Sequence, residues 1–299
     1  MSNIIKIIDQ DVIFLSYDEP NAEKNYADLL TKIPWAKRVH GVKGSDAAHK
    51  ACAKKSETEY FVTIDADNII DPTFLKLEIN LDELNLTSDH VFSWCGKIHV
   101  NGLMYGNGGL KLWTRKFVNE MKTHENSDPD DIQGKVEFCF NDLYYQFSEN
   151  YSLSYTNASP FQAFRAGFRE GVKMCLDQGA QVTDVKTVWW QNYHRLLIWC
   201  NVGADVEHGL WSMYGAREGA YLINCTSWDY SNVRDFEWLT TQWTDKYSQT
   251  APDMLLTNIQ ELGNILNRKC GLDISNLDAL GSAFFKTVYE NSPRVVRHH

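Results

Sequence analysis

Short apolar runs alternate with segments of helical spacing through the first 70 residues. Residues 11–17 and 60–64 form apolar runs typical of buried strands, and a polar loop follows each of them. A further strand is expected between them at residues 36–42. Residues 21–33 and 47–56 carry the apolar spacing, caps and small residues typical of helices. This β-α-β-α-β order predicts an α/β fold with a Rossmann-like, mostly parallel sheet flanked by helices. In such sheets ligands bind at the carboxyl ends of the strands, which is where both polar loops fall.

The pattern changes after residue 90. Two further apolar runs, at residues 90–95 and 110–114, predict two more strands with a glycine-rich stretch between them. The segments that follow predict a surface loop, a helix, a short strand and a second helix, at residues 123–136, 160–178, 196–200 and 206–220. Apolar spacing of about 3.6 residues then predicts further helices at 254–266 and 274–289. We therefore expect a main domain over residues 1–230 and a mainly helical C-terminal extension over residues 231–299 that packs on it.

Composition narrows the class of protein. The chain has 299 residues and a net charge of −10, which argues against a protein that coats nucleic acid non-specifically but leaves room for a local basic surface. Its seven Cys form no CxxC pair, so we expect reduced thiols. No apolar run reaches the roughly 18 to 20 residues of a membrane span, and the N-terminal residues lack the layout of a signal peptide. We expect a cytoplasmic protein without a membrane partner, and the sequence indicates no obligate protein partner.

The strongest chemical signal is a pair of carboxylates at the end of a buried strand. Asp65 and Asp67 directly follow the apolar run at residues 60–64. Two charges at such a place need a cation or strong hydrogen-bond donors to neutralise them. Mn²⁺ or Mg²⁺ prefers oxygen ligands and completes its shell with water and substrate phosphates, which a nucleotide-sugar diphosphate supplies. An Asp-rich turn without a ligand is the alternative, because two acids at this spacing also occur by chance.

The segments around these acids resemble those of GT-A glycosyltransferases. Residues 43–53 and 59–67 resemble the family's metal-binding segment, in which a small-residue helix with a polar residue at the position of His49 precedes the metal strand. The first polar loop resembles the family's nucleotide-contacting loop, and residues 108–116 resemble the strand beneath the sugar. The resemblance is clear over residues 11–72 and weaker over 90–118. It implies a GT-A fold, a UDP-sugar donor and a Mn²⁺ or Mg²⁺ ion, with a nucleotide-sugar half over residues 1–118 and an acceptor half over 119–230.

The same resemblance implies roles for individual residues. The implied metal ligands are Asp65 and Asp67. The implied donor contacts come from the first polar loop, the small-residue helix, the acidic pair and the glycine-rich stretch, and they are Ser16, Tyr17, Asp18, Glu19, Asp46, His49, Asp65, Gly108 and Gly109. A solvent-facing helix position without a ligand is the alternative for His49.

A second acidic cluster opens one of the expected helices and contains Asp205, Glu207 and His208. Inverting GT-A enzymes carry an acid at a similar place that takes the proton from the acceptor hydroxyl. The resemblance therefore implies Asp205 or Glu207 as the catalytic base and His208 as a third metal ligand, while helix capping is the alternative for Asp205. Asp142 competes for the base role, because Asn141-Asp142 is similar to the family's Glu-Asp acceptor pair. Asn at the place of Glu leaves the base, and the choice between inversion and retention, open.

Basic and aromatic side chains form three further clusters. The candidate acceptor contacts among them are Lys111, Trp113, Arg115, Arg165, Arg169, Trp190 and Arg195. Such side chains suit a phosphate-bearing acceptor. The arrangement resembles the compact glycosyltransferases of tailed phages that transfer glucosyl or arabinosyl groups to modified cytosines. This resemblance implies double-stranded DNA with a hydroxymethylated base as the acceptor.

The sequence leaves other functions open. Arg and Lys at helical spacing are usually a solvated face and Trp is usually core, so a glycan, lipid or capsule-type acceptor is an alternative. A non-catalytic module that binds a nucleotide sugar is another, although the presence of both Asp65 and Asp67 argues against it. A nucleotidyltransferase would carry a glycine-rich loop near its N-terminus, whereas residues 11–25 contain no Gly.

Overall fold

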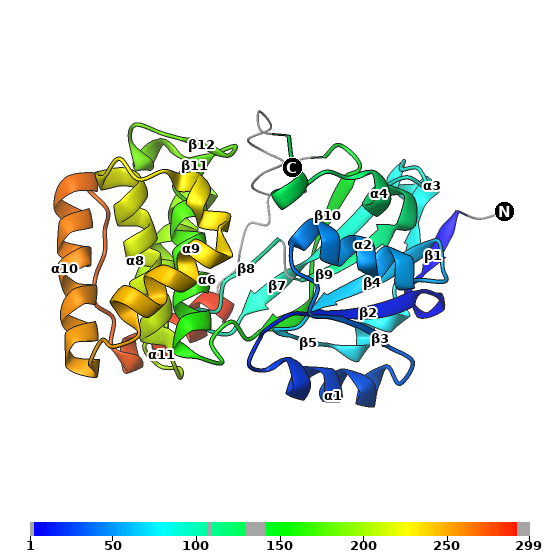
Figure 1. Cartoon of the computed structure of the whole chain (residues 1–299), viewed down its shortest axis with the longest axis horizontal. Coiled ribbons are helices and arrows are strands. Elements are labelled where there is room, and N and C mark those ends of the chain that lie inside the picture. Colours follow the sequence, from blue (N-terminus) through cyan, green and yellow to red (C-terminus); the bar gives the residue numbers. More distant parts are fainter. Residues whose placement is uncertain (1–2, 107–108, 129–140, 292–299) are drawn as a thin grey trace. The chain divides into compact units, whose positions relative to one another are not determined.

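The structure, a computed structural model, describes residues 3–106, 109–128 and 141–291. The described residues form two compact units (Figure 1). The first unit holds the described residues of Met1–Ile98 and Met104–Tyr155, and the second those of His99–Leu103 and Thr156–Val295. The two units are defined by contacts within the chain, whereas the boundary expected after residue 230 separates a main domain from a C-terminal extension. That boundary stays a prediction.

A mixed sheet forms the centre of the first unit. Its described strands, in spatial order, are β3 (Lys37–His40), β2 (Asp11–Ser16), β4 (Tyr60–Asp65), β9 (Leu110–Thr114), β7 (Val91–Ile98), β10 (Tyr144–Ser154) and β5 (Asn68–Ile70), and β8 (Met104–Tyr105) also pairs with β7. The pairings of β2 with β3 and β4, and of β7 with β10, are parallel. In contrast, β9 runs antiparallel to β4 and β7, and β5 runs antiparallel to β10. A small separate ladder pairs β1 (Ile4–Lys6) with β6 (Glu78–Asn80).

Helices cover both faces of this sheet, which confirms the expected α/β class. Figure 1 shows α1 (Ala22–Lys32) and α2 (Ser45–Lys55) on opposite sides of the strands. A strand that is buried on both faces sends successive side chains to opposite cores. Phe14 accordingly packs in the core that includes residues of α1, whereas its neighbour Ile13 packs in the core that includes residues of α2. The shorter helices of this unit are α3 (Leu81–Leu84) and α4 (Arg115–Glu120).

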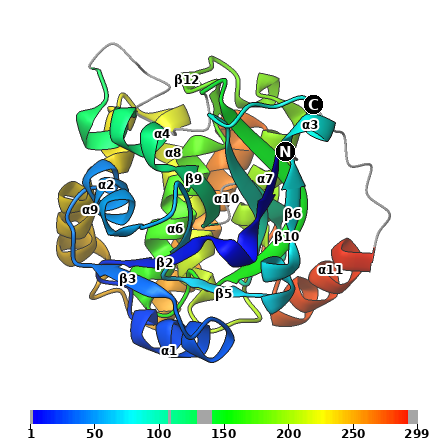
Figure 2. The same ribbon diagram turned by 90° about the vertical axis from the view of Figure 1, so that its right-hand side faces the viewer.

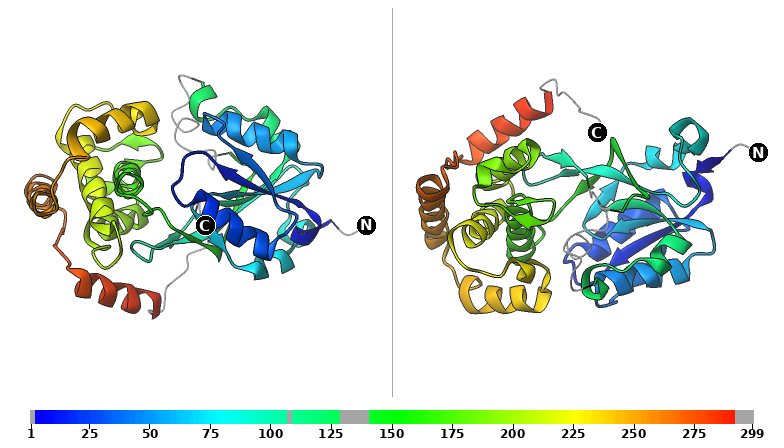
Figure 3. Two further views of the ribbon diagram at one scale, coloured as in Figure 1. Left: turned by 60° about the horizontal axis from the view of Figure 1, so that its bottom comes forward. Right: turned by 90° about the horizontal axis from the view of Figure 1, so that it is seen from above.

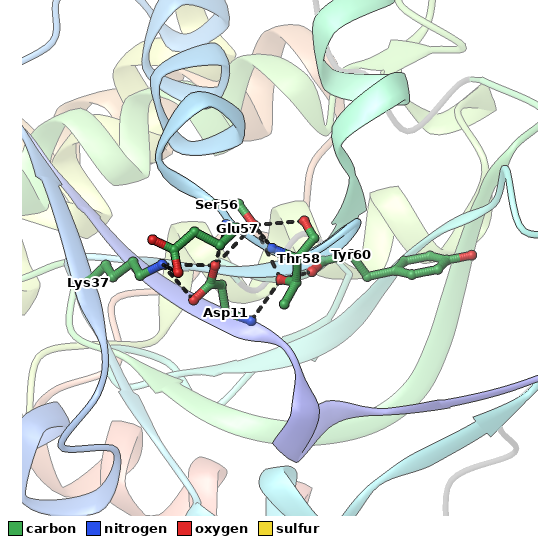
Figure 4. Close-up of polar contacts among 6 residues, drawn as sticks. All are labelled: Asp11, Lys37, Ser56, Glu57, Thr58 and Tyr60. Carbon is green, nitrogen blue, oxygen red and sulfur yellow. Dashed lines mark hydrogen bonds and ion pairs between the residues drawn. The ribbon is translucent and has the colours of Figure 1, made fainter.

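A polar cluster around Asp11 joins the amino ends of the parallel strands (Figure 4). The Asp11 carboxylate accepts hydrogen bonds from Lys37 Nζ (3.0 Å) and Glu57 N (2.6 Å), and the Asp11 amide donates to Thr58 Oγ1 (3.0 Å). Burial alone would raise the pKa of Asp11, but the Glu57 amide and Lys37 outweigh it and the pKa lies below its usual value. Because ligands bind at the opposite ends of the strands, we assign this cluster to stability.

The second unit is mainly helical (Figures 2 and 3). Its described α-helices are α6 (Pro160–Lys173), α7 (Trp190–Asn201), α8 (Gly209–Cys225), α9 (Phe236–Gln242), α10 (Pro252–Cys270) and α11 (Ala279–Asn291). The backbones of α6 and α8 approach closely because glycines face the partner helix. A Cβ atom on Gly167 would lie 1.9 Å from Ser212 O, and one on Gly215 would lie 2.1 Å from Phe164 O. A short hairpin of β11 (Leu176–Asp177) and β12 (Ala180–Gln181) follows α6.

A buried arginine in α8 connects several segments of this unit. Arg217 is 0% exposed, and its guanidinium donates to Cys200 O (2.8 Å), Ile259 O (2.6 Å), Ser275 O (2.8 Å) and Asn276 Oδ1 (2.8 Å). Within the described part of the chain no carboxylate forms an ion pair with it. The charge is therefore compensated by carbonyl dipoles, and each of these acceptors would lose a partner without Arg217.

Most expected elements are confirmed, but one is wrong. Five expected strands are present as β2, β3, β4, β7 and β9; they were expected at residues 11–17, 36–42, 60–64, 90–95 and 110–114. Six expected helices are present, with shifted ends, as α1, α2, α6, α8, α10 and α11; they were expected at residues 21–33, 47–56, 160–178, 206–220, 254–266 and 274–289. Residues 196–200, expected to be a strand, lie in α7, because a short apolar run does not distinguish a buried strand from a buried helix. The loop expected at 123–136 lies partly outside the described residues, and within them it contains the turn η3 (His124–Asn126). No helix in the described ranges combines the length and apolarity needed to cross a bilayer.

Candidate functional site

The acidic pair lies on a turn at the carboxyl end of β4. Asp65 and Asp67 are both partly exposed, and Ala66 between them is 1% exposed. Backbone groups hold the turn in place, since Ala66 O accepts from Asn25 Nδ2 (2.8 Å) and Asp67 O accepts from Tyr155 N (2.7 Å). The helix α1 and the end of β10 thus fix the main chain between the two carboxylates.

Two further residues support the turn, one through the Asp67 carboxylate and one through the main chain of Asp65. Asn68 is buried, donates through Nδ2 to Asp67 Oδ1 (2.7 Å) and accepts through Oδ1 from Ser154 Oγ (2.6 Å). Gly109, which has a φ of +70°, accepts from Asp65 N (2.8 Å). A Cβ atom on Gly109 would lie 2.3 Å from Asn68 Nδ2 and 3.0 Å from Asp65 Cβ, so only glycine allows β9 to begin this close to the turn.

A buried lysine and a buried histidine flank Asp65. The Lys111 ammonium lies 3.7 Å from Asp65 Oδ2, and the Lys111 side chain is 5% exposed compared with 39% for Asp65. His49 Nδ1 donates to Ser45 O (2.7 Å), and its ring packs edge-on against Trp113. Burial lowers the pKa of His49, and the nearby Asp65 carboxylate opposes this shift without cancelling it. His49 is therefore neutral at pH 7, and its contact with a donor stays a prediction.

Other expected donor contacts differ in exposure. Asp46 is 0% exposed, and its Oδ2 accepts from Lys50 Nζ (2.6 Å) and Asn126 Nδ2 (2.7 Å), so this carboxylate anchors the first turn of α2. Ser16 is also buried and accepts from Arg38 Nε (2.9 Å). The rest of the first polar loop is open to solvent.

In that loop Tyr17 is 47% exposed, its amide donates to Glu19 Oε2 (2.8 Å), and Asp18 is exposed. Tyr17 and Asp18 have the exposure that a nucleoside contact requires, and Glu19 is partly exposed. Gly108 lies outside the described residues.

The expected acceptor contacts of the first unit lie in different surroundings. Trp113 is 0% exposed, and its Nε1 donates to Thr63 Oγ1 (2.8 Å), so its ring belongs to the core. Because a fully buried ring offers no surface to an acceptor, we do not include Trp113 in the proposed acceptor surface. Lys111 lies beside Asp65 instead, and Arg115 is half-buried at the start of α4.

The second unit holds the expected catalytic acids of the loop before α8. Asp205 forms an ion pair with Lys286 (2.5 Å), and the two side chains are 15% and 18% exposed. Glu207 is 85% exposed, and its Oε1 lies 3.6 Å from His208 Nε2. His208 adopts a left-handed conformation with a φ of +56°. Asp142 belongs to the first unit and is exposed in the segment before β10.

Two clusters of the second unit combine arginine with exposed aromatic rings. Phe236 is 50% exposed, and the guanidinium carbons of Arg165 and Arg169 lie 5.1 and 5.5 Å from its ring centre. Arg195 lies over the Trp189 ring (5.8 Å), and Trp190 beside it is 52% exposed. Guanidinium groups stacked on exposed rings present both charge and a flat apolar surface.

The acidic turn fits a hard divalent cation. Two partly exposed carboxylates, one of them oriented by Asn68, supply the oxygen ligands that Mn²⁺ or Mg²⁺ prefers, and such ions usually complete their shell with water and phosphate. In the described part of the chain no three His, Cys, Asp or Glu side chains gather into a metal-binding group. Asp65 and Asp67 belong to the first unit and His208 to the second, so a shared ion stays a prediction.

Sequence reasoning missed the residues that brace the turn. Asn25, Asn68 and Ser154 hold the acidic pair, and Lys286 holds Asp205. Lone amides and hydroxyls carry no spacing signature, so only the fold brings them to the site.

Comparisons with known proteins identify no family. No family model matches the chain, and no curated protein matches it. The chain is similar to the solved structure of a glycosyltransferase involved in the glycosylation of the major capsid of PBCV-1, with 12% identity and a TM-score of 0.29 over 48% of this chain and 93% of that chain. It is also similar to the inositol-1-phosphate CTP transferase from T. maritima, with 12% identity and a TM-score of 0.30 over 48% and 68% of the two chains. At these scores the likeness carries no argument about function, which has to come from the residues of the site.

Proposed function

We propose that the chain is a glycosyltransferase that moves a sugar from a UDP-sugar to a hydroxyl acceptor, with a divalent cation at Asp65 and Asp67. The observation that carries this proposal is the braced turn at the carboxyl end of β4, where both carboxylates are partly exposed and Asn68 orients one of them. A turn that served only to end a strand would not need its peptide and side-chain groups held from α1, β9 and β10.

Each residue of the turn has a distinct role in this proposal. Asp65 and Asp67 bind the cation, which supplies neutralisation of the diphosphate leaving group when it is bound. Asn68 holds one Asp67 oxygen through a 2.7 Å hydrogen bond and so orients the carboxylate. The exposed Tyr17 and Asp18 contact the nucleoside.

We assign the base role to Glu207 in preference to Asp205. A general base needs a carboxylate that is available to the acceptor hydroxyl. Glu207 is 85% exposed, whereas Asp205 is mostly buried and bound to Lys286 at 2.5 Å. In this proposal a Glu207 oxygen takes the proton from the acceptor hydroxyl as the glycosidic bond to the diphosphate breaks.

For the acceptor we propose the hydroxymethyl group of a modified cytosine in double-stranded DNA. The support comes from Arg165, Arg169 and Phe236, which combine two positive charges with an exposed ring. Phosphate contacts supply most of the affinity for DNA, and an aromatic ring suits stacking with a base. A local patch of this kind is what a chain with a net charge of −10 would need to bind DNA.

The test measures donor turnover and product together. The chain is incubated with Mn²⁺, a panel of UDP-sugars, and either hydroxymethylated DNA, unmodified DNA or a glycan, and the products are weighed by mass spectrometry. We expect transfer to hydroxymethylated DNA alone, at least about a hundredfold loss in Asp67→Asn, and normal transfer in Asp89→Asn, an exposed acid that pairs with Lys116. Transfer to the glycan alone would contradict the DNA acceptor. Wild-type turnover by Asp67→Asn at limiting Mn²⁺ would contradict the cation site.

A further inference from the structure

Lys111 is an unusual neighbour for a cation site. It lies on β9 opposite Thr63 of β4, and its side chain is 5% exposed. A buried ammonium group needs a compensating negative charge, and the Asp65 carboxylate lies 3.7 Å away. Asp65 is itself 39% exposed, so its carboxylate faces both a buried positive charge and solvent. The proposed cation and Lys111 would therefore compete for the Asp65 carboxylate.

We propose that Lys111 is a positioning residue that compensates Asp65 before substrates bind and pairs with a diphosphate oxygen of the donor once the cation has bound. This inference rests on the proposed function. The ammonium group repels a cation that enters alone, and it attracts the donor's diphosphate when both enter. Donor and cation thus raise each other's affinity through one side chain, and this coupling is reciprocal.

The test separates the two affinities. Binding of Mn²⁺ is followed by the electron paramagnetic resonance of the free ion, and binding of UDP by calorimetry at saturating Mn²⁺. In Lys111→Met, we expect Mn²⁺ alone to bind about tenfold more tightly and UDP about tenfold more weakly. Each tenfold change corresponds to about 1.4 kcal/mol. The matched control is Lys116→Met, which removes an exposed lysine from the adjoining helix and should leave both constants unchanged.

The outcomes distinguish this inference from the proposed function. If both constants are unchanged in Lys111→Met, or if both affinities weaken together, Lys111 has no positioning role of this kind. If the wild-type chain binds neither Mn²⁺ nor UDP, the proposed function fails as well. Lys111→Gln keeps a polar side chain and replaces Lys111→Met if the latter does not fold, with the same opposite shifts expected.

A separate observation concerns two thiols at the ends of α8 and α10. Cys225 Sγ lies 3.5 Å from Cys270 Sγ, and both residues are partly exposed, whereas Cys175 and Cys200 are buried. A disulfide has an S–S distance of about 2.05 Å, so a small movement of the side chains would bring the sulfur atoms to bonding distance. The pair is independent of the proposed function.

We infer that Cys225 and Cys270 form a modification site that a peroxide converts to a disulfide. One thiol reduces the O–O bond to give a sulfenic acid and water, and the other thiol displaces a second water as the S–S bond forms. Two thiols and one hydrogen peroxide thus become one disulfide and two waters. Burial raises the pKa of the Cys270 thiol to about 12, so the reaction should be faster at higher pH.

Peptide mapping without reductant tests this inference. After treatment with hydrogen peroxide, we expect one cross-linked peptide pair containing Cys225 and Cys270, a mass about 2 Da lower, and reversal by dithiothreitol. Cys225→Ser should lose the cross-link, and Cys95→Ser, which removes another partly exposed thiol, should keep it. A cross-link to Cys139 or Cys175 instead, or full alkylation of both thiols after oxidation, would overturn the assignment.

Discussion

Replacement of Asp205 by Asn tests whether this acid is a catalytic base or a structural partner. The Asp205 carboxylate lies 2.5 Å from Lys286 Nζ, and the lysine also donates to Val100 O (3.3 Å). Ser282 of the same helix, α11, accepts from Gly203 N (3.3 Å) in the loop that carries Asp205. The ion pair therefore holds α11 against the loop before α8, and Asp205→Asn removes its negative charge with little change of shape.

The expected loss of stability follows from the burial of the pair. Removal of one partner from a fully buried ion pair costs about 3–5 kcal/mol, because the other charge stays uncompensated. The side chains of Asp205 and Lys286 are 15% and 18% exposed, so water compensates part of the lost interaction. We expect Asp205→Asn to lower the free energy of unfolding by about 2 kcal/mol, which is roughly a 30-fold change in the unfolding constant.

Urea unfolding of the wild type, Asp205→Asn, Lys286→Met and the double variant measures this effect. Lys286→Met should cost a similar amount, and the double variant should be more stable than the sum of the two single changes predicts, which reports the coupling directly. Glu207→Gln is the matched control, because its exposed side chain should change stability by less than about 0.5 kcal/mol while transfer falls. If Asp205→Asn unfolds like the wild type and yet loses transfer, Asp205 is the base and our argument from the ion pair is wrong.

Three further predictions concern other parts of the structure. Gly109→Ala should displace the acidic turn, so that the melting temperature falls and the affinity for Mn²⁺ in a titration decreases. Gly41 has a φ of +74° and open space around its Cβ position, so Gly41→Ala should lower the melting temperature without changing the affinity for Mn²⁺. Arg217→Met should reduce the free energy of unfolding by about 3–5 kcal/mol in urea, because two buried and two part-buried acceptors lose their donor; a loss below about 1 kcal/mol would refute this. Arg165→Glu with Arg169→Glu should weaken DNA binding in a salt titration and lower the slope of log affinity against log salt by about two, and an unchanged slope would place the DNA elsewhere.

The central parallel strands β2 and β4 could be predicted because they are buried on both faces. Val12, Ile13 and Phe14 are successive residues of β2 with 0–1% exposure, which gives a continuous apolar run. The run at residues 196–200 has the same appearance in α7, so the pattern alone does not decide between strand and helix. The strand β10 was not predicted, because the polar residues Gln146, Ser148, Glu149 and Asn150 interrupt its apolar positions, and its pairing with β7 and β5 holds it in the sheet.

The place of the acidic pair was predictable, and its support was not. Asp65 and Asp67 follow an apolar strand, and that order alone puts them at the ligand edge of the sheet. Asn25, Asn68 and Ser154 reach the turn from α1, β5 and β10, and nothing in their local sequence indicates a shared partner. Precision at a site depends on such supporting residues, which are chosen by the fold.

The sequence shows where charged residues occur but not which of them have a partner of opposite charge in the fold. The presence or absence of such a partner decides which acid can act as a base. Asp46 and Lys50 are four residues apart in one helix, so their ion pair follows from helical spacing. The partner of Asp205 lies in a distant helix and appears only in the folded chain. The sequence leaves the base role open among Asp205, Glu207 and Asp142. Because compensation lowers the availability of a carboxylate for proton transfer, our proposal gives this role to Glu207, whose exposed carboxylate has no lysine or arginine partner in the described ranges.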